Sequence, residues 1–184
     1  PKRRTRAIIA KESGLEPLAN ILLLQKTKKT MLEEAEAFVD PEKEIATAQE
    51  ALGGAMDIVA EAISDEADYR QDIRKLTMKK GMLVSEAKEE TTESVYEMYY
   101  HFSEGLEKLA GHRILAVNRG EKEKILTVKI EAPKEDIQRY LEKKIITNDN
   151  PNTAPVLKET IEDSYKRLIA PAIEREIRNE LTER

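Results

Sequence analysis

The stretch from residue 45 to residue 62, IATAQEALGGAMDIVAEA, decides the fold class of this chain. Its apolar residues recur at alternating spacings of three and four, at Ile45, Ala48, Leu52, Ala55, Val59 and Ala62. This spacing places them in one stripe along an α-helix. Gly53 and Gly54 lie inside the stripe, although a glycine costs a helix about 1 kcal/mol relative to alanine. Because no Lys-Ser or Lys-Thr follows to complete a phosphate-binding loop, we expect these glycines to allow close helix–helix approach.

Helical patterns continue on both sides of this stretch. The residues before it predict short helices over 5–13, 15–24 and 31–38, and Gly14 suits the left-handed position that follows a helix. Residues 64–80 predict a further helix with an apolar stripe at Tyr69, Ile73 and Leu76. A final helix is expected over 157–181, kinked or divided at Pro171 because proline removes a backbone donor and clashes with the preceding turn.

Strand-forming residues appear later in the chain. Residues 114–117 and 125–130 are rich in β-formers, and the polar segment 118–124 joins them, so we expect a hairpin. Two strands alone are marginal in water, so the hairpin should pack on helices, with 82–84 as a possible third strand. Between these segments, 91–109 predicts a helix that turns Val95, Met98, Tyr99 and Phe102 inward. Tyr96 and Tyr100 fall off that stripe and are the candidates for a surface contact.

The expected fold is therefore mainly α: a multi-helix bundle with a small β-hairpin or sheet, at about 110–130, packed on the helices. We divide the chain into a helical region over 1–90, an α/β part over 91–147 with the hairpin at 113–130, and a C-terminal helical segment over 148–184. Asn148 to Thr153 is dense in turn formers and marks the best internal boundary. We expect one continuous structural unit, because the hairpin needs helices to cover it.

Composition narrows the class of protein. Cysteine is absent, which excludes a disulfide framework and thiolate zinc sites and fits a reducing compartment. No run of 18 or more apolar residues predicts a membrane span, so we expect a cytoplasmic protein with no membrane partner. The chain lacks an initiator methionine, and its helical pattern runs on to Arg184. We therefore expect a fragment of a longer protein.

The formal net charge is −5, yet the basic residues are clustered. A local patch can hold phosphate in an acidic protein, because salt confines its field to about 8–10 Å. A solvated helix face is the alternative interpretation of each cluster. The candidate nucleic-acid contacts are Lys2, Arg3, Arg4, Arg6, Arg70, Arg74, Lys75 and, at the expected hairpin tip, Arg119.

Residues that carry chemistry are sparse. The two histidines, His101 and His112, belong to no metal-ligand or nucleophile motif; we expect His101 on an aromatic helix face and His112 beside the helix end at Gly111. Adjacent acids occur on predicted helices, but catalytic carboxylates must converge in a cleft with separated pKa values. We therefore predict no enzyme activity, no metal and no cofactor.

Five strings occur in order along the chain: residues 1–7 (PKRRTRA), 14–19 (GLEPLA), 38–43 (FVDPEK), 111–121 (GHRILAVNRGE) and 168–176 (LIAPAIERE). Together they closely resemble the bacterial Tex family of transcription accessory proteins. The resemblance implies a long, mostly helical, cytoplasmic protein with an RNase H-like domain, helix-hairpin-helix elements and a C-terminal RNA-binding domain. This chain resembles the N-terminal to central helical region, which stops where the RNase H-like domain should begin.

Two functions follow from this resemblance. In the first, the chain is a non-catalytic scaffold in a protein that binds RNA or DNA through its full length and meets RNA polymerase or other transcription factors. In the second, the basic segment at the N-terminus, with Arg70, Arg74 and Lys75, contacts phosphates directly and without regard to sequence. A protein-interaction module unrelated to nucleic acid is a third possibility.

Overall fold

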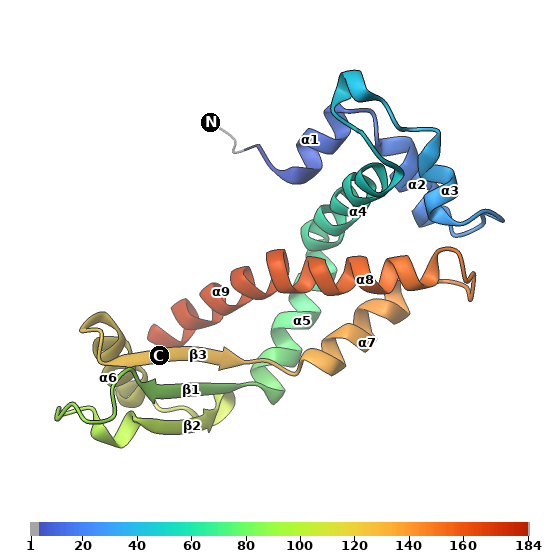
Figure 1. Cartoon of the computed structure of the whole chain (residues 1–184). Helices are drawn as coiled ribbons and strands as arrows, with labels where there is room; N and C mark the ends of the chain where they lie inside the picture. The colour runs from blue at the N-terminus through green and yellow to red at the C-terminus, as the bar shows by residue number, and fades with distance from the viewer. Residues whose placement is uncertain (1–3, 184) are drawn as a thin grey trace. The chain divides into compact units, whose positions relative to one another are not determined.

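The computed structural model describes residues 4–183, which form two compact units (Figure 1). The first unit holds the described residues up to Tyr69 together with Gln138–Ile169. The second holds Arg70–Ile137 and the residues from Ala170 onward. Each unit is therefore built from segments that lie far apart in the sequence. The serial division at 90 and 147 that we expected differs from this arrangement.

In the first unit, helix α4 (Ala48–Asp65) packs against four other helices. These are α1 (Arg6–Glu12), α2 (Glu16–Leu24), α3 (Met31–Glu36) and α8 (Ala154–Ser164). Ala55 and Val59 are buried, as the stripe at 45–62 predicted, whereas Ala62 of that stripe is exposed and the unpredicted Ala51 is buried. The predicted close approach is confirmed at Gly54, where an added Cβ would lie 2.4 Å from Leu15 and 3.3 Å from Ala10, but it is wrong at Gly53, where an added Cβ would meet nothing within 4 Å.

The polar centre of this unit is Gln25, which ends α2 in the left-handed conformation at φ 57°. Its side chain is buried and donates a hydrogen bond to the carbonyl of Ile145 at 2.9 Å, where α7 (Lys134–Ile145) ends. The same side chain accepts a 2.9 Å hydrogen bond from the amide of Thr147. Asn148 and Asn150 donate to the Gln25 carbonyl at 2.9 and 3.1 Å. The turn formers at 148–153 therefore join two distant segments of one unit and do not lie at a boundary between units.

Replacing Gln25 with alanine should lower the free energy of unfolding by about 1–3 kcal/mol. The Ile145 carbonyl and the Thr147 amide would lose a buried partner, and an unsatisfied buried polar group costs roughly that much. Urea denaturation of the variant measures the effect. Lys26→Ala, an exposed change in the same loop, is the control and should leave stability within about 0.5 kcal/mol of the wild type. Equal stability of the two variants would contradict the assignment.

The second unit contains an antiparallel sheet in the order β2-β1-β3 (Figure 1). Central strand β1 (Met82–Ala87) pairs with β2 (His101–Gly105) and with β3 (Leu126–Glu131). Helix α6 (Gly111–Lys122) packs on β3 and is also in contact with α9 (Ala170–Thr182). The remaining long helix, α5 (Ala67–Lys80), ends just before β1. A mainly α fold with a small sheet is confirmed, and so is the third strand near 82–84.

The predicted hairpin at 113–130 is wrong in its first strand. Residues 114–117 belong to α6, and only 126–131 form a strand. Ile114 and Val117 are both buried, a spacing of three that suits a helix face. Gly120 continues that face, and an added Cβ there would lie 2.5 Å from Leu126. The tertiary contact with β3 thus overrides the β-propensity of the segment.

The helix predicted over 91–109 is also wrong. This region holds two short 3₁₀ turns, η2 (Glu97–Tyr99) and η3 (Leu106–Lys108), on either side of β2. Tyr96 and Tyr100 are buried, so our expectation of surface contacts there is wrong as well. Val95 and Met98, which we expected to face inward, are exposed. The sheet accounts for the change, because β2 must extend to pair with β1.

The expected division of the last helix at Pro171 is confirmed. A π-helical turn, Tyr165–Ile169, separates α8 from α9, and Pro171 is the second residue of α9. Proline has no amide proton to donate to the carbonyl four residues earlier, at Arg167. Such π turns occur where the regular ladder of helical hydrogen bonds is interrupted. The boundary between the two units lies next to this turn, between Ile169 and Ala170.

Candidate nucleic-acid interface

The basic N-terminal cluster is described only in part. Lys2 and Arg3 lie outside the described residues. Arg4 is exposed and forms an ion pair with Glu12 at the end of α1. Arg6 is the first residue of α1, and its charge acts on the carboxylate of Asp57 in α4. The two described arginines thus each have a carboxylate of the same unit nearby.

Asp57 is half-buried within a small charged cluster of the first unit. Arg167 lies 3.6 Å from Asp57 and 3.1 Å from Asp163, one turn earlier in its own helix. Burial raises the pKa of Asp57; the charges of Arg167 and Arg6 lower it in part, and Asp163 raises it further. The net direction is upward from 3.8, so ionisation of this carboxyl opposes folding.

The pH dependence of stability should report this cluster. Because the folded-state pKa of Asp57 lies above its unfolded value, ionisation destabilises the fold as pH rises through that window, and the cost is fully present at neutral pH. Asp57→Asn mimics the protonated form and removes this dependence. The stability of the variant relative to wild type should therefore increase from about pH 3 to about pH 7 in urea titrations. If the stability difference between the variant and the wild type stayed constant or shrank as pH rises, the raised pKa of Asp57 would be contradicted.

Arg70 and Arg74 form a ladder of ion pairs with α9. Arg70 donates to Glu176 at 3.0 Å, and Arg74 donates to Glu180 at 2.9 Å with a second contact to Glu176 at 3.7 Å. Each pair of partners is four residues apart on its own helix, so the two rows of side chains face each other. These two candidate phosphate contacts are thus already bound to carboxylates within the second unit.

Changing Arg70 and Arg74 together to methionine should lower the free energy of unfolding by about 1 kcal/mol, since half-exposed ion pairs contribute roughly 0.2–1 kcal/mol each. Lys75→Met with Lys79→Met is the matched control from the same helix and should change stability far less. Thermal unfolding at low and high salt compares the two, and high salt should narrow the gap. A control variant as unstable as the arginine variant would contradict a specific role for the ladder.

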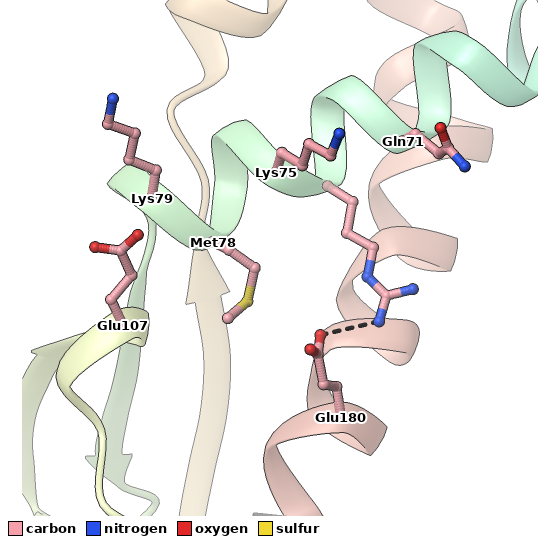
Figure 2. Close-up of a pocket in the computed structure, with 7 residues that line it drawn as sticks. Gln71, Lys75, Met78, Lys79, Glu107 and Glu180 are labelled. Atoms are coloured by element: carbon pink, nitrogen blue, oxygen red, sulfur yellow. Dashed lines mark hydrogen bonds and ion pairs between the residues drawn. The ribbon is translucent and has the colours of Figure 1, made fainter.

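An open hollow of about 570 Å³ lies beside this ladder (Figure 2). Gln71, Lys75 and Lys79 follow one another at intervals of four residues along α5 and line it. Met78 and Arg74 also line the hollow, as do Glu107 of η3 and Glu180 of α9. Lys75 and Lys79 are exposed and form no ion pair with any residue from 4 to 183. Of the predicted basic residues on α5, Lys75 is the one with a free ammonium group.

Sequence reasoning left Lys79, Gln71 and Met78 out of the candidate site. The signal was present, because Gln71, Lys75 and Lys79 repeat at the spacing that aligns side chains on a helix. Arg119, by contrast, is not at a hairpin tip. It is exposed in the last turn of α6, apart from the residues that line the hollow. The structure therefore brings together Arg70, Arg74 and Lys75 and does not join them to Arg119.

The histidines are exposed and lie outside any such cluster. His101 begins β2 and lies 2.7 Å from Glu90. His112 is in the first turn of α6, so our placement of it after a helix end is wrong. No group of three or more acidic, histidine or cysteine side chains within residues 4–183 is arranged to hold a metal ion. Among the same residues, no helix combines the length and apolar character that a membrane crossing requires.

The fold and these contacts define a mainly helical module with a small antiparallel sheet, whose charged side chains form ion pairs between segments distant in sequence. The chain belongs to the Tex family, because residues 26–184 match the family model described as Tex central region-like. The resemblance to this family is thereby confirmed over residues 26–184.

Similar proteins occur in bacteria and in animals. The chain is 50% identical over its full length to the uncharacterized protein YdcI of Bacillus subtilis, and it covers 26% of that protein. It is 30% identical to the human S1 RNA-binding domain-containing protein 1 over 97% of the chain and 19% of the relative. It is 32% identical to the transcriptional accessory protein Tex of Neisseria gonorrhoeae over 74% of the chain and 18% of the relative. The chain thus spans about a quarter or less of the length of these relatives.

Proposed function

We propose that this chain is a non-catalytic helical scaffold within a larger, cytoplasmic Tex-like transcription accessory protein. That larger protein would bind RNA or DNA and meet RNA polymerase or other transcription factors. Membership of the Tex family supports this proposal, as do the names of two relatives, which refer to transcription and to an RNA-binding domain. The scaffold positions neighbouring parts of the parent protein and offers helical surface to protein partners.

The observation that carries the proposal is that Arg70 and Arg74 form ion pairs with α9. These residues are the strongest candidates on α5 for binding phosphate through a planar guanidinium group. Both instead hold α9, more than a hundred residues further along the chain, through carboxylates. A phosphate would have to displace Glu176 or Glu180 to reach either side chain. Their present geometry therefore supports a role in holding the second unit together.

Direct phosphate contact is the second candidate, and the hollow on α5 favours it. Lys75 and Lys79 present two exposed ammonium groups one helical turn apart, a spacing suited to a flexible, sequence-independent contact with a nucleic-acid backbone. Glu107 and Glu180 at the same hollow reduce the local positive charge. The N-terminal segment that contains Lys2, Arg3, Arg4 and Arg6, and separately Arg119, would add further contacts.

Fluorescence anisotropy with labelled single- and double-stranded oligonucleotides, at about 50 and 200 mM salt, separates the two candidates. Three charge-reversed variants are compared with wild type: Lys2, Arg3, Arg4 and Arg6 all changed to Glu; Lys75→Glu with Lys79→Glu; and Lys143→Glu with Lys158→Glu. The last pair is exposed, lies outside the hollow and matches the second variant in net charge. It therefore controls for the general effect of added negative charge.

The scaffold proposal predicts no measurable binding by the isolated chain, or binding that the Lys75 and Lys79 variant weakens no more than the Lys143 and Lys158 control does. Phosphate contact by the hollow predicts that the Lys75 and Lys79 variant loses more affinity than the Lys143 and Lys158 control, and contact by the N-terminal segment predicts the same of the variant at Lys2, Arg3, Arg4 and Arg6. Two such contacts on a single strand should make wild-type affinity fall about sevenfold between the two salt concentrations. A specific loss of affinity in the Lys75 and Lys79 variant would contradict the proposal that this chain acts only as a scaffold.

A further inference from the structure

Val95 and Met98 are more exposed than any other large apolar side chain that the structure describes. Their exposed fractions are 86% and 67%. Scattered exposed apolar residues are normal on a protein surface, but these two are only three residues apart in the sequence. Met98 is the middle residue of η2, and Val95 directly precedes Tyr96, the residue that caps this turn. Tyr96 and Tyr99, also three residues apart, are both buried.

The segment that carries this apolar pair is held firmly. The Tyr96 hydroxyl donates to Glu123, and its backbone amide donates to Ser94 at 3.1 Å. The Tyr100 hydroxyl lies 2.8 Å from the Ser94 hydroxyl. The buried Ser85 hydroxyl of β1 donates to the Tyr99 carbonyl at 2.8 Å. The three tyrosines therefore fix the backbone in a conformation that leaves Val95 and Met98 outside.

Acidic side chains predominate in the sequence around the pair, and the charge of Arg119 acts on the neighbouring Tyr96. Glu93 and Glu97 flank it within two residues, and Glu89 and Glu90 lie on the same loop; all four are exposed. Lys88 is the single basic residue between 86 and 100. This charge disfavours nucleic acid and anionic lipid as occupants, since both carry negative charge. It favours a surface that offers Lys or Arg around an apolar centre.

We propose that Val95 and Met98 form an anchor that docks into an apolar pocket on a separate protein, with Lys or Arg side chains of that protein against Glu93 and Glu97. We call Val95, Met98, Glu93 and Glu97 the anchor turn. Its geometry matches that of protein interfaces, in which a few buried apolar side chains supply most of the affinity and a polar rim supplies specificity. Because the turn is fixed before binding, little conformational entropy is lost on docking.

The test uses the full-length protein in the cells that produce it. A photo-crosslinking amino acid, p-benzoyl-phenylalanine, replaces Met98, and the same residue replaces Leu115 in a control. Leu115 is 55% exposed and lies on α6 of the same unit. Irradiation at position 98 should give a discrete adduct with another protein, and irradiation at position 115 should give none. Mass spectrometry should place the crosslink at apolar residues of the partner that are flanked by Lys or Arg.

Two further variants test whether formation of the adduct depends on the acidic and the apolar side chains of the anchor turn. Glu93→Lys with Glu97→Lys should reduce the yield of the adduct at least about tenfold, and so should Val95→Ser. Neither change should alter the thermal unfolding of the chain, because these side chains are exposed. The absence of an adduct at position 98 would overturn the proposal. So would an adduct with nucleic acid, with the protein's own chain or with a second copy. An adduct whose yield charge reversal leaves unchanged would also overturn it. These outcomes are independent of oligonucleotide binding and therefore of the proposed scaffold function.

Discussion

Each unit of this chain depends on side chains that reach a segment more than a hundred residues away in the sequence. In the first unit, Gln25 bonds to the end of α7, and the Ser164 hydroxyl of α8 donates to the Ala60 carbonyl of α4 at 2.6 Å. In the second, Arg70 and Arg74 of α5 bind Glu176 and Glu180 of α9. Helix α4 packs on α1, α2 and α3 from its own part of the sequence and also on α8, and α6 packs on β3 and also on α9. The later helices α8 and α9 therefore complete the packing around α4 and α6.

The need to join distant segments explains why many charged side chains of this protein form ion pairs. In a protein with 36% charged residues, solvated faces are the ordinary expectation. Here the arginines of α5, together with Arg167 and Arg178, lie against carboxylates, and Arg178 bonds to Glu121 of α6 at 2.6 Å. Arginine suits this role because its planar group forms several directed hydrogen bonds at once. Lysines such as Lys75 and Lys79 are left for solvent or for a ligand.

The sequence predicted those parts of the fold that depend on local periodicity. The stripe at 45–62, the close approach at Gly54, the extended run after Gly81 and the break near Pro171 all follow from spacing and backbone chemistry. The segments 91–109 and 114–117 were predicted wrongly, because their conformation depends on the pairing of β2 with β1 and on the packing of α6 against β3. A single sequence carries no direct signal of such long-range partners. For the same reason Arg70 and Arg74 looked like free cations, whereas their carboxylate partners lie on α9.

Hydrogen exchange of the Ile161→Val variant tests the central claim most directly. Ile161 is fully buried in α8, and removing one buried methylene costs about 0.5–1.5 kcal/mol. If α4 and α8 belong to one cooperative unit, the slowest-exchanging amides of α2 and α4 should lose the same protection free energy as those of α8. A loss confined to residues 154–164 would contradict the account, because it would mean that the N-terminal helices fold without the segment that returns to them.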